Sequence, residues 1–323
     1  MKWTIDRRGM AALALSLFAA AASAQEFPSK PIHIVVPFAP GGGTDVLTRI
    51  VAQQLTEQLK QQVVVENKPG AGGAVGGALV AKAPADGYTL YIGTNATSML
   101  PGLYKNLSFD PIGDFKPVAL IGTSPFLLIV NNKLPVKSLP ELLALAKASP
   151  GTLTYGSAGN GSVNHVGMEM FKSMAGVNIL HVPYRGSSAA LADVIGGNVS
   201  MMLDTFVSST QHVKAGTVRA MAVTGSQRST LAPDVPTVDE QGVKGFDVSV
   251  WYGFVAPKGT PDAVVQKLNA EMQKVLANPA VRQRFSQLGA EPVQISPENF
   301  QKMWLDEEKK WSGVIKAANI RIE

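Results

Sequence analysis

Two glycine-rich loops carry the residue pattern that most directly suggests binding chemistry. The first, PFAPGGGTD at residues 37–45, follows a β-branched run and precedes a helical pattern. The second, GSAGNGS at residues 156–162, stands in the same position between a strand pattern and a helical pattern. Free N–H groups and the helix dipole attract an anion at a helix N-terminus, and glycine lets the backbone come close to it. The pair of loops predicts a site for a carboxylate or phosphate that needs no cationic side chain.

The nucleotide-binding fingerprints are incomplete. A phosphate-binding P-loop ends in Gly-Lys-Ser/Thr, whereas Gly43 is followed by Thr44 and Asp45. In the two G-x-G-x-x-G-like stretches, Val75 and Asn164 replace the third glycine. Tight turns remain the alternative interpretation of all these glycines.

Catalytic constellations are also incomplete, so no catalytic residue, metal site or cofactor is predicted. Neither Ser157 nor Ser162 lies in a G-x-S-x-G elbow, and no His, Asp and Glu cluster has metal-ligand spacing. His181 is expected in the core or on a sheet face. Two alternatives stay open for His165 and Asp204: a contact with the ligand, or a structural role, which for Asp204 would be a helix cap.

Strand and helix patterns alternate along most of the chain. The first series has strands at 32–36, 63–65 and 88–92, a helix at 45–59 and a small-residue helix ending near residue 83. This order predicts parallel strands with right-handed crossovers. The second series has strands at 126–130, 153–155, 179–182, 199–203 and 218–223, followed by an aromatic extended segment at 246–254. The rest is expected to be helical, with caps at Thr260-Pro261 and Ser296-Pro297. The pattern predicts an α/β protein of two lobes.

The first 24 residues are predicted to be a secretory signal peptide. Lys2, Arg7 and Arg8 precede an apolar run at 10–22, and Ala22-Ser23-Ala24 is a cleavage signal that places the cut before Gln25. The general export route is the default, and the arginine pair leaves the twin-arginine route open. Because the chain of 323 residues has no cysteine, no disulfide is expected.

The remaining composition excludes two further classes of protein. The formal net charge is +5, with no basic run or arginine-aromatic interleaving that would indicate a nucleic-acid partner. No later segment has about 20 continuous apolar residues, so the exported chain is expected to be soluble.

Several blocks resemble the periplasmic receptors of tripartite tricarboxylate transporters, also called Bug receptors. From residue 27 to the C-terminus they are KPIHIVVPFAPGGGTDVLTRIVAQQL, VVVENKPGAGG, DGYTLYIGT, VPYRGSSAALADVIGGNVSMMLD and WYGFVAPKGTP, in family order. The resemblance implies a type II periplasmic binding fold, in which two α/β lobes enclose a ligand cleft. Two extended crossovers would join them near 118–123 and 246–251, so that lobe 1 comprises 25–122 and 247–323 and lobe 2 comprises 123–246.

The resemblance also implies the residues of the cleft. Lobe 1 would hold the ligand carboxylate through Phe38, Ala39, Gly42, Thr44 and Asp45, with Thr94, Asn95, Ala96 and Thr97 facing the cleft. Lobe 2 would contribute Ser157, Gly159, Ser162, His165 and Asp204. Two positions depart from the family pattern: Asn95-Ala96, where small hydroxyl residues are usual, and Arg185, where lysine is common.

Arg185 and its neighbour Tyr184 are a candidate second recognition element. They lie in a turn after a strand and before a helix, where an arginine could hold a distal ligand carboxylate with two parallel hydrogen bonds. A surface charge at the rim of the cleft is the alternative.

The function implied is a non-catalytic, monomeric periplasmic receptor that binds a small carboxylate and contacts membrane transporter subunits transiently. Dicarboxylates, tricarboxylates, acidic amino acids and aromatic acids all remain open as ligands. One alternative is a sensor that presents its closed form to a histidine-kinase ectodomain. Another is a secreted hydrolase or isomerase, against which the missing catalytic constellation stands.

Overall fold

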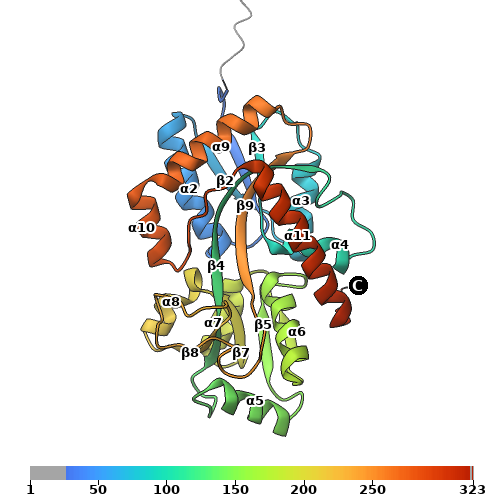
Figure 1. Ribbon diagram of the computed structural model, residues 1–323, viewed down its shortest axis with the longest axis vertical. Coiled ribbons are helices and arrows are strands. Elements are labelled where there is room, and N and C mark those ends of the chain that lie inside the picture. Colours follow the sequence, from blue (N-terminus) through green and yellow to red (C-terminus); the bar gives the residue numbers. More distant parts are fainter. Residues whose placement is uncertain (1–26, 321, 323) are drawn as a thin grey trace, which may run out of the picture.

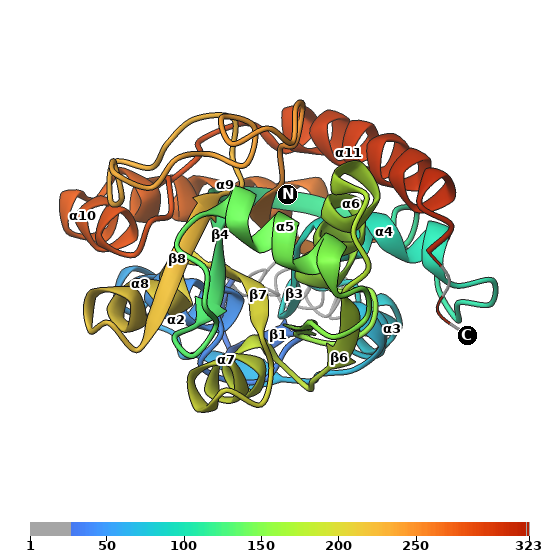
Figure 2. The ribbon, with the colours of Figure 1, turned by 90° about the horizontal axis from the view of Figure 1, so that it is seen from below.

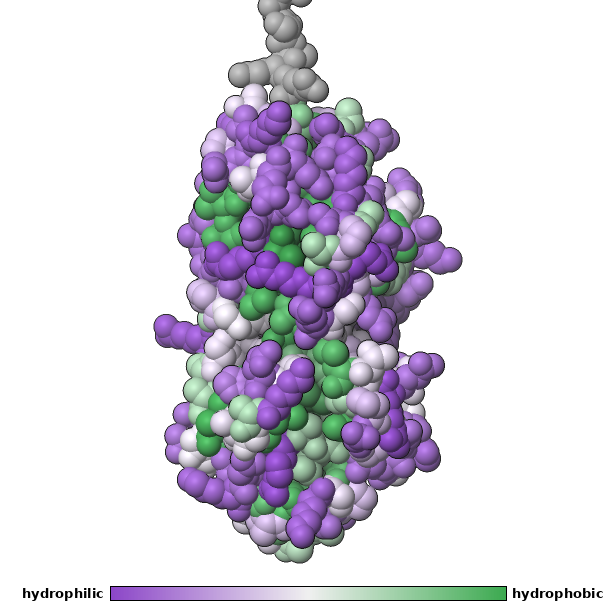
Figure 3. Space-filling view, turned by 90° about the vertical axis from the view of Figure 1, so that its left-hand side faces the viewer, coloured by the Kyte–Doolittle hydropathy of each residue, from purple (hydrophilic) through white to green (hydrophobic). Residues whose placement is uncertain are grey.

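The protein consists of two α/β lobes connected by long strands, as the computed structural model shows for residues 27–320 and 322 (Figure 1). The predicted signal peptide, 1–24, lies outside the described residues. Polar side chains cover much of the face in Figure 3, and apolar surface is visible around the waist between the lobes. The lobe boundaries suggested by the sequence, at 122/123 and 246/247, stay a prediction.

The sheet of lobe 1 has the strand order β2-β1-β3-β9-β4. The first three strands are parallel, as the βαβαβ pattern predicts, while β9 runs antiparallel to both β3 and β4. Their bounds are β1 Ile32–Val36, β2 Val63–Asn67, β3 Thr89–Gly93, β4 Phe115–Asn131 and β9 Ser249–Pro257.

The sheet of lobe 2 has the order β8-β4-β7-β5-β6, because the second half of β4 continues into it. The pairs β5–β6 and β5–β7 are parallel, and β4 is antiparallel to both β7 and β8. The remaining strands are β5 Thr154–Ser157, β6 Leu180–Pro183, β7 Met201–Thr205 and β8 Val218–Val223.

The strands β4 and β9 form the connection between the lobes and run side by side through the waist (Figure 1). Their antiparallel register extends from Phe115 opposite Pro257 to Pro125 opposite Ser249, with two register shifts. At the waist, Thr123 exchanges backbone hydrogen bonds of 2.9 and 2.8 Å with Glu291, in the segment before the last helix. A change in the angle between the lobes must therefore be accommodated in this pair of strands.

Helices cover both faces of the lobe 1 sheet. The core residues of α2 and α9 belong to one apolar cluster, and Val80 of α3 belongs to the cluster on the other face. The helices α4 and α11 contribute core residues to both clusters. The C-terminal helices thus complete the N-terminal lobe. The helices of this lobe are α2 Gly43–Leu59, α3 Ala74–Ala81, α4 Asn95–Leu103, α9 Asp262–Ala277, α10 Pro279–Gln287 and α11 Pro297–Ala317, with a short 3₁₀ helix η1 at Ala71–Gly73.

In lobe 2, α5 and α6 lie on one face of the sheet, and α7 and α8 lie on the other (Figure 2). The alternation of side chains along β4 accounts for this arrangement. Leu128 and Val130 join the core cluster beneath α5 and α6, whereas Leu127 and Ile129 join the cluster beneath α7 and α8. The helices are α5 Leu139–Ala148, α6 Val163–Ala175, α7 Ser187–Gly196 and α8 Phe206–Lys214.

The spacing of apolar residues in the sequence predicted most helices correctly, but it did not predict every buried side chain. Leu47, Val51 and Leu55 are buried on α2, as their four-residue spacing predicts. On α6, by contrast, Met174 of the last turn is 41% exposed. Phe171 is buried instead, with its ring centroid 5.8 Å from that of Phe246.

One predicted helix cap is confirmed and one is wrong. The Ser296 hydroxyl accepts a hydrogen bond from the Asn299 N–H and caps α11, with Pro297 at its first position. Thr260 does not cap α9, because that helix begins one residue later than the motif suggests, with Pro261 at the N-cap position. The Thr260 hydroxyl is buried and has no hydrogen-bond partner among the described residues.

The packing of α11 on β9 yields a matched pair of glycine substitutions. A Cβ at Gly253 of β9 would lie 2.1 Å from Cζ of Phe300, whereas a Cβ at Gly313 of α11 would have no neighbour within 4 Å. We expect Gly253→Ala to lower the free energy of unfolding by about 1–3 kcal/mol through overpacking. Gly313→Ala should raise it by about 0.5–1 kcal/mol, because alanine favours the helix. Urea titrations measure both, and equal effects would contradict this account.

Candidate functional site

A small cavity of about 50 Å³, here called the deep cavity, lies between the two lobes. The first glycine loop and α2 line it from lobe 1, with Phe38, Gly42, Gly43 and Thr44. Lobe 2 supplies residues from the second loop and from the starts of three helices. The crossover strands contribute Phe126, Val250 and Tyr252.

Five helix N-termini meet at the deep cavity. The lining residues include the N-cap or first residue of α2, α4, α6, α7 and α8, namely Gly42, Gly43, Thr94, Ser162, Val163, Ser187 and Thr205. In four of these helices, no side chain caps the N-terminus; only α4 is capped, by Thr94. Uncapped N–H groups and the positive ends of the helix dipoles are therefore directed toward one small volume.

The deep cavity has no lysine, arginine or histidine among its lining residues. An anion in it would be held by backbone N–H groups and by hydroxyls such as those of Thr44, Ser162 and Thr205. Such donors are fixed by the fold and need no reorganisation when a ligand arrives. The arrangement suits a carboxylate.

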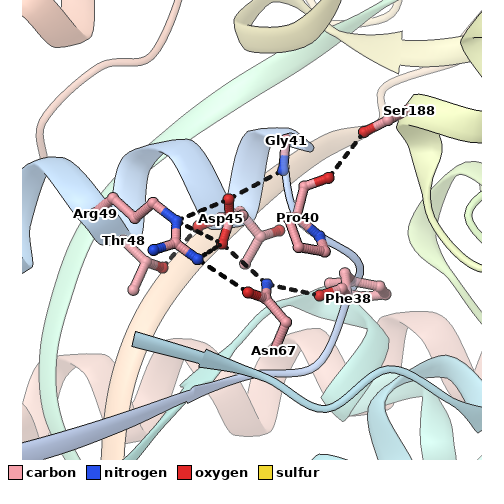
Figure 4. A network of polar contacts seen from close by, with 9 residues as sticks. Phe38, Pro40, Gly41, Asp45, Thr48, Arg49, Asn67 and Ser188 are labelled. Atoms are coloured by element: carbon pink, nitrogen blue, oxygen red, sulfur yellow. Dashed lines mark hydrogen bonds and ion pairs between the residues drawn. The ribbon is translucent and has the colours of Figure 1, made fainter. Parts of the chain in front are cut away.

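The first loop takes its shape from Asp45, which is 3% exposed (Figure 4). Its carboxylate accepts 3.0 Å hydrogen bonds from the Gly41 N–H and the Arg49 guanidinium, and one of 2.9 Å from Asn67. Asn67 also donates to the Phe38 carbonyl at 2.9 Å. Burial by itself would raise the pKa of Asp45, but these hydrogen bonds outweigh it and hold the pKa below its usual range. Asp45 thus positions the loop, and its side chain does not line the cavity.

Gly41 shows why this loop requires glycine. Its φ of +84° lies in the left-handed region, which other residues adopt only with strain. This conformation turns its N–H toward Asp45.

The lobes meet directly across the cleft. The Ser188 hydroxyl of α7 donates to the Pro40 carbonyl of the first loop at 3.1 Å (Figure 4). A Cβ at Gly42 would lie 2.8 Å from the Ser187 hydroxyl, and one at Gly43 would lie 2.6 Å from the Thr205 hydroxyl. The structure therefore represents a closed form in which glycine permits close approach.

The second loop is supported from behind by stacked rings. His181 lies between His165 and Tyr155, with ring centroids 4.1 and 4.7 Å away. Its Nε2 is 2.6 Å from the Ser157 hydroxyl, and Nδ1 of His165 accepts the Gly161 N–H at 3.2 Å. Ser157 and His165 thus hold the loop and line neither cavity of the cleft.

Both histidines are neutral at pH 7. Burial lowers the pKa of His165 to about 4, with a further contribution from the Lys172 ammonium. Burial and the neighbouring His165 lower the pKa of His181 to about 3. Because a neutral Nδ1 can accept the Gly161 N–H and a protonated one cannot, the loop geometry requires this state.

Asp204 lines the deep cavity at the end of β7 and is 1% exposed. Neither of its carboxylate oxygens makes a well-formed hydrogen bond with the described residues, although the Ser208 hydroxyl and the Thr205 N–H lie near it. Thr205, not Asp204, is the N-cap residue of α8. The helix-cap alternative for Asp204 is therefore wrong.

A larger outer cavity of about 770 Å³ adjoins the deep cavity, and Phe38 and Ala158 line both. The predicted residues Gly159, Tyr184 and Arg185 line the outer cavity and not the deep one. Arg185 is exposed, while the Tyr184 hydroxyl donates to Asp193 at 2.5 Å. Arg185 is the one charged side chain in this lining.

The 15 predicted site residues fall into three groups. Those lining the deep cavity are Phe38, Gly42, Thr44, Thr94, Ser162 and Asp204. Those lining the outer cavity are Phe38, Gly159, Tyr184 and Arg185. Those lining neither are Ala39, Asp45, Asn95, Ala96, Ser157 and His165.

Asn95 illustrates the third group. Its side chain donates to Glu307 of α11 at 2.5 Å and accepts the Trp251 backbone N–H at 2.9 Å. It therefore fastens the start of α4 to the crossover strand β9 and to α11.

Several lining residues were not predicted, among them Gly43, Asn164, Ser187, Thr205 and Tyr252. A sequence signal existed for three of them. Gly43 belongs to the first glycine loop, and Ser187 and Thr205 each follow a strand and stand at the start of a helix. Tyr252 lies mid-strand and carries no such signal.

The described residues contain neither a metal-binding group of side chains nor a helix suited to crossing a membrane. No group of three or more His, Asp or Glu side chains is placed to hold a metal ion. No helix among them is long and apolar enough to span a membrane.

The family model of the tripartite tricarboxylate transporter family receptor matches residues 47–320. Protein BugT of Bordetella pertussis (strain Tohama I) is 36% identical over 313 residues, which is 96% of each chain. A UPF0065 protein from the tcbD-tcbE intergenic region of Pseudomonas sp. (strain P51) is 40% identical, over 96% of this chain and 93% of that one.

Solved structures match equally closely. The periplasmic binding protein BugD has a TM-score of 0.88 and 38% identity, with 92% of this chain and all of that chain covered. Rpa4515 of R. palustris with adipate has a TM-score of 0.89 and 37% identity, at the same coverage. MatC of Rhodopseudomonas palustris with bound malate has a TM-score of 0.86 and 35% identity, over 90% of this chain and all of that chain.

The stacked histidines predict an acid-sensitive contribution to stability. Because folding lowers their pKa from 6.5, the unfolded state binds more protons below that pH. The contribution is thus fully present above about pH 6.5 and is lost as the pH falls toward the folded values.

We test this with His181→Phe, which keeps a ring beside Tyr155 and removes one titrating group. The variant should be less stable than the wild type at pH 7, because it loses the contact with Ser157. On going to about pH 5, the gap in unfolding free energy should narrow by about 1–2 kcal/mol. Chemical denaturation at both pH values measures the gap, and a constant gap would contradict the assignment.

Proposed function

The chain belongs to the family of tripartite tricarboxylate transporter receptors, and from that premise we propose that it is a periplasmic receptor for a small organic acid. It captures the acid between its lobes and delivers it to the membrane subunits of a tripartite transporter. These contacts are transient, the receptor acts as a monomer, and it uses no cofactor and performs no chemistry on the ligand. Export by the N-terminal signal and cleavage near Ala24 would place it in the periplasm.

One observation carries the proposal: five helix N-termini meet at a cavity whose lining has no cationic side chain. This geometry favours a carboxylate held by backbone donors. The relatives solved with adipate and with malate support this ligand class.

The two adjoining cavities suggest how a diacid would lie. One carboxylate occupies the deep cavity at Gly42, Gly43 and Thr44. The chain passes Phe38 and Ala158, which line both cavities. The distal end then lies in the outer cavity near Arg185. The volume of the outer cavity leaves room for ligands of different length.

A thermal-shift screen tests the proposal. The protein is unfolded, stripped of ligand and refolded, and is then heated with adipate, malate, citrate, glutamate, nicotinate or neutral analogues. Binding to the native state raises the melting temperature by mass action, so at least one acid should raise it and its neutral amide should not. If no carboxylate in a broad panel shifts the melting temperature, the proposal fails.

Closure can be blocked at the first loop. A Cβ at Gly43 would lie 2.6 Å from the Thr205 hydroxyl and 3.2 Å from the Tyr252 hydroxyl, while the loop itself needs no change. Gly43→Ala should therefore fold normally and bind the acid found in the screen at least about tenfold more weakly, a loss of about 1.4 kcal/mol. The control is Gly196→Ala at the end of α7, where the nearest atom would be 3.7 Å away.

Small-angle X-ray scattering supplies the second measurement for this variant. Wild type and Gly196→Ala should become more compact on adding ligand, as expected for a hinge closing around it. Gly43→Ala should show a smaller decrease in the radius of gyration. Wild-type affinity together with full closure in Gly43→Ala would show that the close contact with Thr205 is not required.

Arg185 provides a test of ligand length. If it reads a distal carboxylate, Arg185→Ala should weaken adipate binding by about 1 kcal/mol, the upper range for an exposed ion pair. Hexanoate, which lacks the second carboxylate, should bind wild type and variant alike. Calorimetry with the two ligands decides, because equal losses would leave Arg185 as a rim charge without a role in selectivity.

A further inference from the structure

Asp204 is the one side chain in the deep cavity whose charge opposes an anionic ligand. It is 1% exposed at the end of β7, and neither carboxylate oxygen makes a well-formed hydrogen bond with the described residues. The Ser208 hydroxyl and the Thr205 N–H lie near enough to favour the ionised form, but burial outweighs them. Buried carboxylates normally accept several hydrogen bonds, because an unpaired buried charge is strongly unfavourable. The ionised form of Asp204 is thus poorly accommodated.

Tyr252, from the crossover strand β9, is a titratable neighbour that interacts electrostatically with Asp204. Tyr252 lines the same cavity, and its hydroxyl makes no well-formed hydrogen bond with the described residues, although the Thr205 hydroxyl lies near it. Burial and the nearby Asp204 raise the pKa of Tyr252 above its ordinary value, so the hydroxyl remains a neutral donor. Two potential hydrogen-bonding groups therefore border the space that a ligand would fill.

Charged groups on the other elements around Asp204 have partners elsewhere. On α2, Asp45 is paired with Arg49, and on α7, Asp193 accepts from Tyr184. The remaining groups lie behind the second loop or at the far end of α8. They are His165, Glu169 and Lys172 of α6, and His212 and Lys214 in the last turn of α8.

We propose that Asp204 is the proton-carrying group of the site: it is protonated when an acid binds and donates a hydrogen bond to the ligand carboxylate, so that one proton is taken up with each ligand. This inference rests on the proposed function. No covalent bond changes; the proton comes from solvent and returns to it when the ligand leaves.

The geometry favours a donor over an acceptor. An ionised Asp204 beside a ligand carboxylate would place two like charges in a cavity with little water, where their repulsion is strong. A protonated Asp204 removes one charge and offers an O–H, while the helix N-termini balance the charge of the ligand. Burial also raises the pKa of Asp204 to about 7, so protonation is accessible near neutral pH.

Binding should consequently depend on pH. Where the free receptor has an ionised Asp204 and the complex a protonated one, affinity falls up to about tenfold per pH unit as the pH rises. This range lies above the pH at which the ligand carboxylates are themselves ionised. The receptor would then bind best on the acidic side of neutrality.

Isothermal titration calorimetry tests the inference with adipate and malate, in buffers of different ionisation enthalpy between about pH 6.5 and about pH 8.5. Wild type should take up close to one proton per ligand toward the upper end. Asp204→Asn keeps the size and a neutral N–H donor, so it should take up none and its affinity should not vary with pH. Asp234→Asn, at an exposed carboxylate, is the matched control and should behave as wild type.

Two outcomes of this titration would overturn the inference. In the first, wild type takes up no proton on binding, or wild type and Asp204→Asn take up equal numbers of protons. In the second, Asp204→Asn loses the binding of malate but not of adipate, and wild type takes up no proton. That result would make Asp204 an ionised acceptor for the hydroxyl of malate.

A ligand-free measurement separates this inference from the proposed function. If neither acid binds, the melting temperatures of wild type and Asp204→Asn are compared from about pH 5 to about pH 8.5. A folded pKa raised above the unfolded 3.8 gives stability that is lost as the pH rises through about 7. As the pH rises over this range, the melting temperature of wild type should therefore fall relative to that of Asp204→Asn. A constant difference between the two melting temperatures would show that Asp204 does not hold a proton in the folded receptor.

Discussion

The structure depends on one constraint: two sets of helix N-termini must face each other across a cleft. Each right-handed strand–helix unit places its loop at the carboxyl end of the strand, so each lobe alone presents only part of a binding site. The shared strands β4 and β9 bring the two sets together. They also allow the lobes to separate, because no other strand pairing joins the two sheets in the described chain. The proposed capture and release of a ligand would use the same connection.

The polar side chains around the site divide into those that could touch a ligand and those that shape the loops. Asp45 holds the first loop through the Gly41 N–H, and His181 holds the second through Ser157. Both lie behind the cavity surface. With its own partners fixed, each loop can leave backbone N–H groups free for a ligand, which explains how a cleft without a cationic side chain can still bind an anion. The histidine stack extends this principle, since it supports the loop only while its rings are neutral.

The balance of charge in the cleft also gives a reason for the proposed protonation of Asp204. The helix dipoles supply enough fractional positive charge to balance a ligand carboxylate. Among the described residues that line the deep cavity, there is no further counter-ion for a second buried anion, which an ionised Asp204 would be. A carboxyl group that is neutral when the cleft is closed resolves this conflict without an added cation. In this view, the glycines at 42 and 43 and the proton on Asp204 serve the same end. They let the polar surfaces of the two lobes come into contact around a carboxylate ligand.

The sequence by itself determined the α/β class, the two glycine loops and the character of an anion site, because these follow from local periodicity and from glycine between a strand and a helix. It also carried the family resemblance. It did not determine which polar residues line the cavity: Asn95 was expected to face the cleft, but its side chain bonds to Glu307. Nor did it reveal Tyr252 or the contact between Gly43 and Thr205. These relations join residues far apart in the chain, and only the packing of one lobe on the other through β4 and β9 decides them.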